Sequence, residues 1–288
     1  MTFGASFLGL PPCPIERADA VIVPLPLEQT VTYGTGTGGA PAAIIEASRQ
    51  VELFDEETRV DFEQSPRLHT MPPVADQAGL PDYLDAVARC VAPLRDKFVL
   101  ALGGEHTLTL GMVAGLIDDP AELTIVQIDA HADLIDELDG RRLSHGTVMR
   151  RLWEKGCRLV QIGVRSLSRQ EFQLAATGRR IDTFYAHQLD RQWEKLLATL
   201  RALQGKVYLS VDVDGLDPSV IPSTGTPQPG GLSWQQTMTV IRTLAANSSA
   251  RLLAADLVEF VPSPHPPGCD LTAARLAEKI LAYLTVPK

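Results

Sequence analysis

Residues 123–133 read Leu-Thr-Ile-Val-Gln-Ile-Asp-Ala-His-Ala-Asp, and this stretch decides the fold class. Its first six residues form a nearly continuous apolar run with β-branched side chains, which is typical of a strand covered on both faces of a parallel sheet. The polar segment that follows carries a potential ligand at every second residue. Alternate residues of an extended chain point the same way, so Asp129, His131 and Asp133 can converge on one point at the end of the strand.

Five more apolar runs have the same character and are predicted as strands: residues 20–25, 98–102, 158–163, 207–213 and 252–258. Amphipathic helical patterns fill the gaps between them. Ser233 and Gln236 form a capping box that begins one helix, and Asp270 or Thr272 is placed to cap the last. Strands that alternate with helices predict βαβ units, and hence an α/β fold with a mostly parallel sheet.

Length and composition narrow the class of protein. The chain has 288 residues, 45% of them hydrophobic, with no internal repeat or linker-like segment, so we expect a single domain spanning residues 1–288. The net charge of −9, without a basic block, argues against nucleic-acid and membrane-surface partners and favours a cationic substrate. Four scattered cysteines indicate reduced thiols in a cytoplasmic protein, and no signal peptide or membrane span is evident.

Two more polar segments follow predicted strands. The segment 103–106 (Gly-Gly-Glu-His) follows the run 98–102, and Asp212 and Asp214 stand at the end of the run 207–213. Three strand ends thus supply six metal-ligand side chains: His106, Asp129, His131, Asp133, Asp212 and Asp214. Each fragment alone is compatible with a loop, a turn or a helix cap, but four clustered carboxylates without a cation would repel one another. The set is sufficient for two ions, and its oxygen-rich, sulfur-free character favours Mn²⁺ over Zn²⁺ without excluding Co²⁺, Ni²⁺ or Fe²⁺.

These residues resemble the ureohydrolase family, which includes arginase, agmatinase and formiminoglutamase. The resemblance spans essentially the whole chain, and its long aspartate-rich segment is highly specific. The matching segments are residues 103–107, 129–133, 144–146, 210–218 with its continuation through 222–231, and 256–259. The resemblance implies a three-layer α/β/α sandwich and assembly as a homotrimer or homohexamer. Position 105 is Glu where many members have Asp, and Glu also occurs there in agmatinase-like members.

The resemblance also implies roles for single residues. One Mn²⁺ would be held by His106, Asp129, Asp133 and Asp212. The other would be held by Asp129, His131, Asp212 and Asp214, so that Asp129 and Asp212 are shared. His145 matches the proton-shuttling histidine, Glu259 the glutamate that binds the guanidinium, and Thr226 a hydroxyl near the reacting group of the substrate. Asp133 is placed to take a proton from the attacking water and pass it to the departing amine.

The residues after Asp133 bear on the substrate. Arginine-specific members carry an Asn-rich pattern here that holds the α-carboxylate, whereas residues 134–143 read Leu-Ile-Asp-Glu-Leu-Asp-Gly-Arg-Arg-Leu. Acidic residues in this position repel a carboxylate and attract an ammonium group, which favours agmatine and its hydrolysis to putrescine. Arg141 or Arg142 could instead bind the tail of guanidinobutyrate. A longer substrate, N1-aminopropylagmatine, fits if the mouth of the site, which the Gly-rich segment 32–39 is expected to line, is open.

Two other classes of protein share some of these features. A single-metal amide deacetylase has a related sheet and an Asp-x-His ligand pair, but His106 and Asp214 add ligands for a second ion. A metal-stabilised scaffold without catalytic activity would be expected to lack a ligand, and all six are present. Hydrolysis of a guanidine to urea is therefore the leading interpretation.

Overall fold

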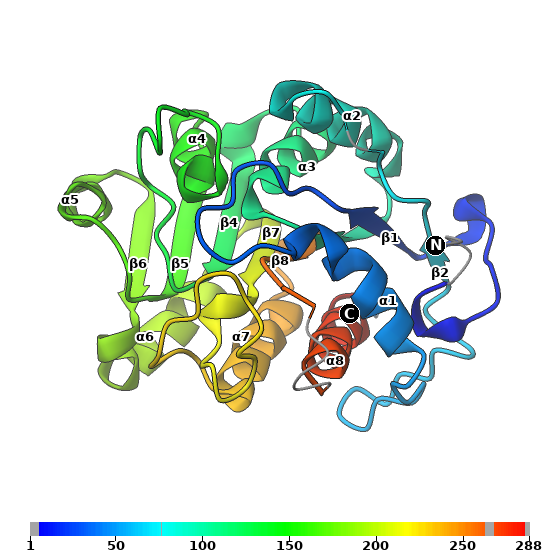
Figure 1. Ribbon diagram of the computed structural model, residues 1–288. Coiled ribbons are helices and arrows are strands. Elements are labelled where there is room, and N and C mark those ends of the chain that lie inside the picture. Colours follow the sequence, from blue (N-terminus) through cyan, green and yellow to red (C-terminus); the bar gives the residue numbers. More distant parts are fainter. Residues whose placement is uncertain (1–5, 76, 263–267, 286–288) are drawn as a thin grey trace.

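A single sheet of eight parallel strands forms the centre of the computed structural model, which describes residues 6–75, 77–262 and 268–285 (Figure 1). The strands lie in the order β2-β1-β3-β8-β7-β4-β5-β6. Their bounds are β1 Ala20–Leu25, β2 Leu68–Thr70, β3 Phe98–Gly103, β4 Leu123–Ile128, β5 Arg158–Val164, β6 Ile181–Tyr185, β7 Gly205–Asp212 and β8 Ala250–Val258. Parallel neighbours require crossover connections, and helices make most of them.

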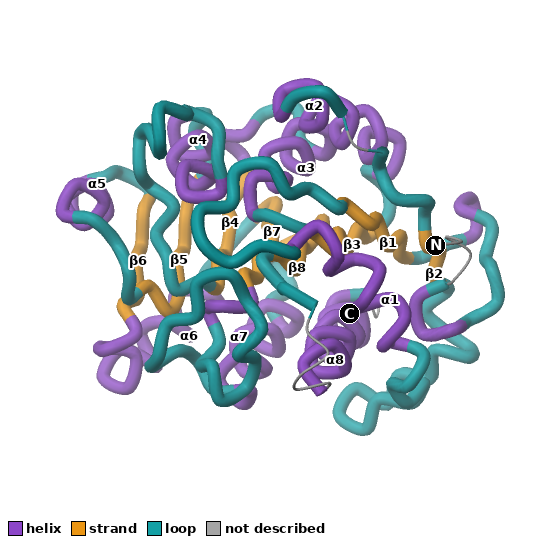
Figure 2. The backbone as a smooth tube through the Cα atoms, viewed as in Figure 1, coloured by secondary structure: helices purple, strands orange, loops and turns teal. Residues whose placement is uncertain are grey.

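Helices cover both faces of the sheet and complete three layers (Figure 2). Their bounds are α1 Ala40–Ser48, α2 Leu80–Val91, α3 Thr109–Leu116, α4 Val148–Glu154, α5 Arg169–Thr177, α6 Leu189–Arg201, α7 Trp234–Ala246 and α8 Gly268–Leu284. Helices α1, α6, α7 and α8 pack on one face, and α2 to α5 on the other. Alternate strand residues supply the two cores, with Ile22 and Val126 in one and Val21 and Ile125 in the other. The predicted α/β/α sandwich is confirmed.

The six predicted strands are all present, and the Ser233–Gln236 capping box begins α7 as expected. The short edge strands β2 and β6 were not predicted. The predicted cap of the last helix is wrong, because α8 already includes Gly268 and both Asp270 and Thr272 lie within its first turns. Residues 263–267, including His265 and most of the proline-rich segment 262–267, lie outside the described residues. Within the described part of the chain, no helix is both long and apolar enough to cross a membrane.

The register of the central strands determines where the polar segments meet. Ile128 of β4 pairs with Val211 of β7, and Asp212 of β7 pairs with Val258 of β8. Strand β3 pairs with β8 on its other side. Because these four parallel strands are neighbours and end nearly level, the residues that follow them lie at one edge of the sheet.

A buried ionic cluster joins α8 to the segment that follows α1. Glu278 and Lys279 of α8 are buried, as is Asp55, which lies 2.5 Å from the Lys279 ammonium. Arg275 pairs with Glu278 at 2.8 Å and with the exposed Glu56 at 2.8 Å. Burial outweighs the nearby cations and raises the pKa of the Glu278 carboxyl to about 7.

This raised pKa predicts a stability change with pH. Between about pH 4.5 and 7 the folded chain retains a proton on Glu278 that the unfolded chain releases, so the folded state loses stability as pH rises through this window. Glu278→Gln removes the titration. We expect the free energy of unfolding of the variant, relative to that of wild type, to rise by about 3 kcal/mol between pH 4 and pH 8. The melting temperatures of both proteins at each pH report this difference. A difference independent of pH would contradict the assignment.

Candidate metal centre and substrate cavity

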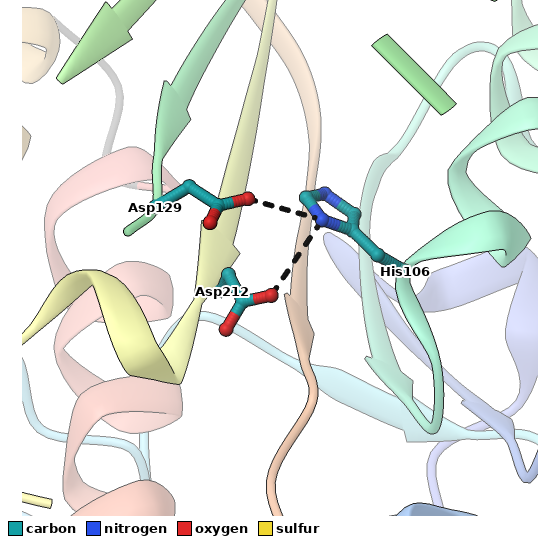
Figure 3. A group of neighbouring side chains, drawn as sticks. All are labelled: His106, Asp129 and Asp212. Carbon is teal, nitrogen blue, oxygen red and sulfur yellow. Dashed lines mark ion pairs between the residues drawn. The ribbon is translucent and has the colours of Figure 1, made fainter. Parts of the chain in front are cut away.

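His106 lies at the centre of the first group of predicted ligands. It opens the 3₁₀ turn His106–Leu108 that follows β3. Its Nδ1 atom lies 3.3 Å from Asp129 Oδ2, 3.0 Å from Asp133 Oδ2 and 3.6 Å from Asp212 Oδ2, and all four side chains are buried. Figure 3 shows Asp129 and Asp212 pointing at the imidazole ring from the ends of neighbouring strands. The structure thus brings together the four residues predicted to hold one ion.

Ser210 and Asp256 determine which nitrogen of His106 carries the proton. Ser210 Oγ donates to Asp256 Oδ1 at 2.7 Å and therefore accepts from His106 Nε2, also at 2.7 Å. Tyr208 and Thr109 donate to the other oxygen of Asp256. In the neutral ring the buried Nδ1 is then an unprotonated nitrogen, without a hydrogen-bond partner, that faces three carboxylates. A lone pair facing carboxylate oxygens is repulsive unless a cation lies between them, so this donor set fits a divalent metal ion.

His131, Asp129 and Asp214 form a second group beside the first. His131 Nδ1 lies 3.0 Å from Asp214 Oδ2 and 3.7 Å from Asp129 Oδ1. Ligand atoms lie within 4.8 Å of one another in each of two triads, one of His106, Asp129 and Asp212 and the other of Asp129, His131 and Asp214. Asp129 belongs to both triads, as a shared ligand must. Asp212, also predicted to be shared, falls within the first triad and reaches the second by accepting the backbone N–H of Asp214 at 2.9 Å.

The charges of this cluster are unbalanced without a cation. Burial and the neighbouring charge of Asp129 raise the pKa of Asp133 to about 7, and burial likewise raises the pKa of Asp212 well above its ordinary value. Burial lowers the pKa of His106, but its contacts with Asp129 and Asp133 outweigh this and hold it well above that of free imidazole. Protons thus supply the positive charge that divalent ions would otherwise provide. Binding of the ions would release these protons.

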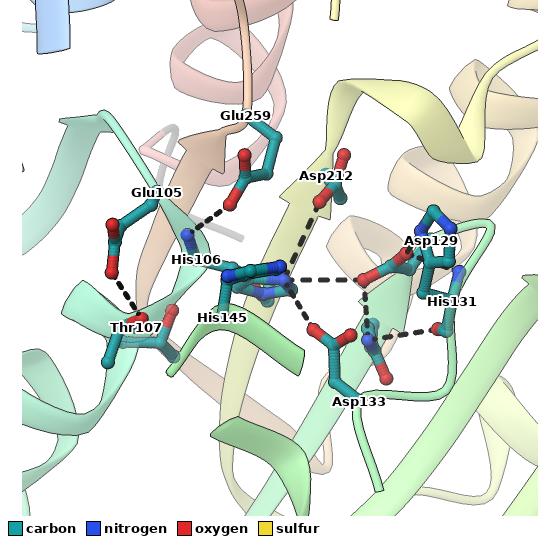
Figure 4. Close-up of polar contacts among 12 residues, drawn as sticks. Glu105, His106, Thr107, Asp129, His131, Asp133, His145, Asp212 and Glu259 are labelled. Atoms are coloured by element: carbon teal, nitrogen blue, oxygen red, sulfur yellow. Dashed lines mark hydrogen bonds and ion pairs between the residues drawn. The ribbon is translucent and has the colours of Figure 1, made fainter. Parts of the chain in front are cut away.

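Glu259 follows β8 and lines the same cavity as the predicted ligands. Its Oε1 accepts the backbone N–H of His106 at 2.6 Å (Figure 4), and its own N–H donates to the carbonyl of Gly104 at 2.9 Å. Burial raises the pKa of its carboxyl to about 8. Glu259 and Asp133 both adopt positive φ angles, 61° and 52°. Such backbone strain in non-glycine residues is typical of functional sites.

His145 and Thr226 also line this cavity, as the sequence predicts. His145 begins the 3₁₀ turn His145–Thr147, whose start is capped by Ser144. Burial lowers the pKa of His145, so its ring is neutral near pH 7. Thr226 donates to Asp214 Oδ2 at 3.3 Å, which places its hydroxyl beside the second triad. Eight of the nine predicted site residues therefore line one cavity, and the ninth, Asp129, joins them as the member common to both triads.

The cavity that these residues share has a volume of about 300 Å³. Its wall includes residues of the Gly-rich segment 32–39 and of the loop 134–143, both of which the sequence predicts near the site. Sequence reasoning missed the side chains that come from the segment 166–171. Glu171 adds a further carboxylate, held by the backbone N–H groups of Leu134 and Ser168 at 3.0 and 2.7 Å. The Ser168–Glu171 capping box of α5 is visible in the sequence, but nothing in it shows that the carboxylate faces the site.

The acidic loop 134–143 has a different arrangement from the expected one. Its contribution to the cavity wall is the apolar pair Ile135 and Leu138. Asp136 forms an ion pair with Arg151, and Arg142 lies 3.5 Å away. Asp136 thus pairs with basic residues of the loop and of α4, and the cavity wall instead carries the carboxylate of Glu171.

The remaining described histidines and the cysteines lie apart from the site. His69 contacts the carbonyl of Cys13 through Nδ1 at 2.6 Å, and His187 is exposed beside Gln188. The four cysteines are free, in keeping with the expected reduced state. None of these side chains is among those that line the cavity.

Comparisons with known proteins agree with this site. The model of the arginase family matches residues 18–285. The N(1)-aminopropylagmatine ureohydrolase of Synechocystis is 34% identical over 277 residues, covering 92% of this chain and 89% of that protein. Its counterpart from Thermus thermophilus is 35% identical over 266 residues, covering 91% and 89%. The crystal structure of agmatine ureohydrolase of Thermoplasma volcanium superposes with a TM-score of 0.84 at 27% identity, covering 93% of this chain and 90% of that one. With its parallel sheet, its paired His and Asp triads and a family match over nearly its whole length, the chain belongs to the arginase family.

Proposed function

We propose that this chain is a two-metal hydrolase that cleaves the guanidino group of a small cationic substrate into urea and a primary amine, with agmatine, which yields putrescine, as the first candidate substrate. The observation that carries the proposal is the pair of His and Asp triads that share Asp129 in one cavity with Glu259. The relatives support it, because their names place them among ureohydrolases of agmatine and aminopropylagmatine.

The residues of the cavity suit this chemistry. A guanidinium stays protonated at neutral pH and its carbon is a poor electrophile. Two ions held here would lower the pKa of a water molecule enough for hydroxide to attack at neutral pH. The Glu259 carboxylate pairs with the planar guanidinium and orients its carbon. Asp133 takes a proton and delivers it to the departing amine, and His145 exchanges protons with solvent.

We propose Mn²⁺ as the bound metal and two ions per chain. The donors are oxygen-rich and contain no sulfur, which suits Mn²⁺. The second triad, with His131 and Asp214, distinguishes this site from the single-metal site of a deacetylase. Elemental analysis of the purified protein is expected to find two metal ions per chain.

The wall of the cavity supports a cationic substrate tail. Ile135, Leu138 and Leu167 offer apolar surface for a methylene chain, and Glu171 offers a carboxylate for an ammonium group. Tyr33 lines the cavity with 83% of its surface exposed, so it stands at an open mouth. This opening accommodates the longer N1-aminopropylagmatine, which is the second candidate substrate. The carboxylates of guanidinobutyrate and arginine are less suited to such a wall.

A panel of guanidines tests the proposal directly. With Mn²⁺ present, we expect urea release from agmatine and N1-aminopropylagmatine, and a kcat/KM for 4-guanidinobutyrate lower by about 100-fold or more, because its tail carboxylate faces Glu171. Agmatine and 4-guanidinobutyrate are nearly equal in length, so the comparison isolates the charge of the tail. Absence of urea from every guanidine would overturn the proposed function, and equal use of both would remove the role of Glu171.

The properties of the whole molecule remain predictions. From the resemblance and the composition we propose one domain over residues 1–288, a homotrimer or homohexamer, a cytoplasmic location and a place in polyamine biosynthesis. Sedimentation of the metal-loaded protein measures the number of chains in the assembly.

A further inference from the structure

Glu105 is a fully buried carboxylate beside the metal centre whose oxygens are all engaged by protein donors. Its Oε2 accepts the backbone N–H groups of Gln29 and Thr30, each at 2.6 Å. Its Oε1 accepts the hydroxyls of Thr30 at 2.8 Å and Thr107 at 2.7 Å (Figure 4 shows the Thr107 contact). Glu105 thus joins the turn that carries His106 to the segment leading into the cavity wall at 31–34.

The Thr30 hydroxyl connects this carboxylate to His145. Thr30 Oγ1 lies 3.2 Å from the backbone nitrogen of His145 and 3.2 Å from its ring Nδ1. A hydroxyl has one hydrogen, and the carboxylate of Glu105 accepts without donating, so Thr30 gives its hydrogen to Glu105. Its oxygen must then accept from both His145 groups. The hydrogen-bond network therefore assigns the proton of the neutral ring to Nδ1.

This tautomer leaves Nε2 as the unprotonated nitrogen of the ring. Since His145 lines the cavity, that nitrogen is available to accept a proton there. We propose that Glu105 and Thr30 are positioning residues that hold His145 with its proton on Nδ1 and its Nε2 free to receive a proton during the reaction. The catalytic role of His145 in this proposal rests on the proposed function. The orientation of its ring rests on the geometry alone.

A matched pair of substitutions at Thr30 tests this. Thr30→Val removes the hydroxyl and keeps a branched side chain, whereas Thr30→Ser keeps the hydroxyl. For Thr30→Val we expect two metal ions per chain, a KM within about 3-fold of wild type, a kcat lower by about 10- to 100-fold, and a His145 ring turned from its wild-type position in crystals of the metal-loaded protein. For Thr30→Ser we expect a kcat within about 3-fold of wild type and an unmoved ring, because the acceptor for Nδ1–H remains. Thr199→Val, on the exposed side of α6, controls for the exchange itself.

The outcomes separate this inference from the proposed function. A wild-type kcat in Thr30→Val with an unmoved ring would overturn the positioning role, as would equal losses in the Val and Ser variants. If wild-type protein releases no urea from any guanidine, the proposed function fails, and the ring position in the two crystal structures still tests the orientation. Glu105→Gln adds a second measurement. Its amide cannot accept from all four donors, so we expect the segment 29–34 to shift and the His145 ring to turn as in Thr30→Val.

Discussion

Asp129→Asn is expected to abolish both metal loading and urea release. Asp129 is the residue common to the two triads, with Oδ2 toward His106 and Oδ1 toward His131. An amide carries no charge and presents one oxygen instead of two, so one ion loses a ligand atom and both lose the negative charge of the shared carboxylate. Loss of an outer partner alone typically costs 10- to 100-fold in metal affinity, so we expect the loss of this shared ligand to exceed about 100-fold. Elemental analysis and the urea assay measure the two effects.

The control for this substitution is an aspartate far from the site. Asp182 on β6 is exposed and pairs with Arg158, so Asp182→Asn makes the same chemical change with normal metal content and turnover expected. Circular dichroism spectra of both variants establish that the fold is retained. Two ions per chain and wild-type turnover in Asp129→Asn would show that this carboxylate is not the shared ligand.

The residues of the candidate metal centre could be predicted from the sequence because strand ends and potential ligands are local features. The run 123–128 indicates a buried strand, and the polar alternation after it marks the point where that strand leaves the sheet. The parallel topology then brings separate strand ends to one edge without knowledge of any side-chain contact. For this reason Asp129 and Asp212, distant in the chain, could be placed together.

The wall of the cavity was much less predictable. Asp136 seemed by its charge to face the substrate, yet the ion pair with Arg151 removes it from that role. Glu171 has the sequence pattern of a helix cap, and only the fold shows that it also lines the cavity. The edge strands β2 and β6 are short, and polar side chains such as Asp182 interrupt their apolar pattern. Pairing with a neighbouring strand, which one sequence does not reveal, makes such segments extended.

Glu259→Gln is expected to impair substrate use while leaving the metal centre loaded. The carboxylate presents two acceptors to the fork of N–H groups on a guanidinium, and the amide replaces one of them with a donor. Removing one partner of a desolvated charge pair costs about 3–4 kcal/mol, which corresponds to roughly 100- to 1,000-fold in kcat/KM. The amide oxygen can still accept the His106 backbone N–H that Glu259 Oε1 accepts at 2.6 Å, so the loop that carries this ligand keeps its anchor.

The separation of these two effects is what distinguishes a substrate-binding role from a structural one. If Glu259 served only to hold His106, the Gln variant, whose amide oxygen keeps that hydrogen bond, would retain both its metal and its kcat/KM. If it binds the guanidinium, the variant contains two ions per chain, and excess Mn²⁺ leaves the loss in kcat/KM unchanged. Glu194→Gln, on the exposed surface of α6, controls for the chemical change. The positive φ of Glu259 favours the second outcome, because strain at a strand end persists where the surrounding structure aims a side chain into a site.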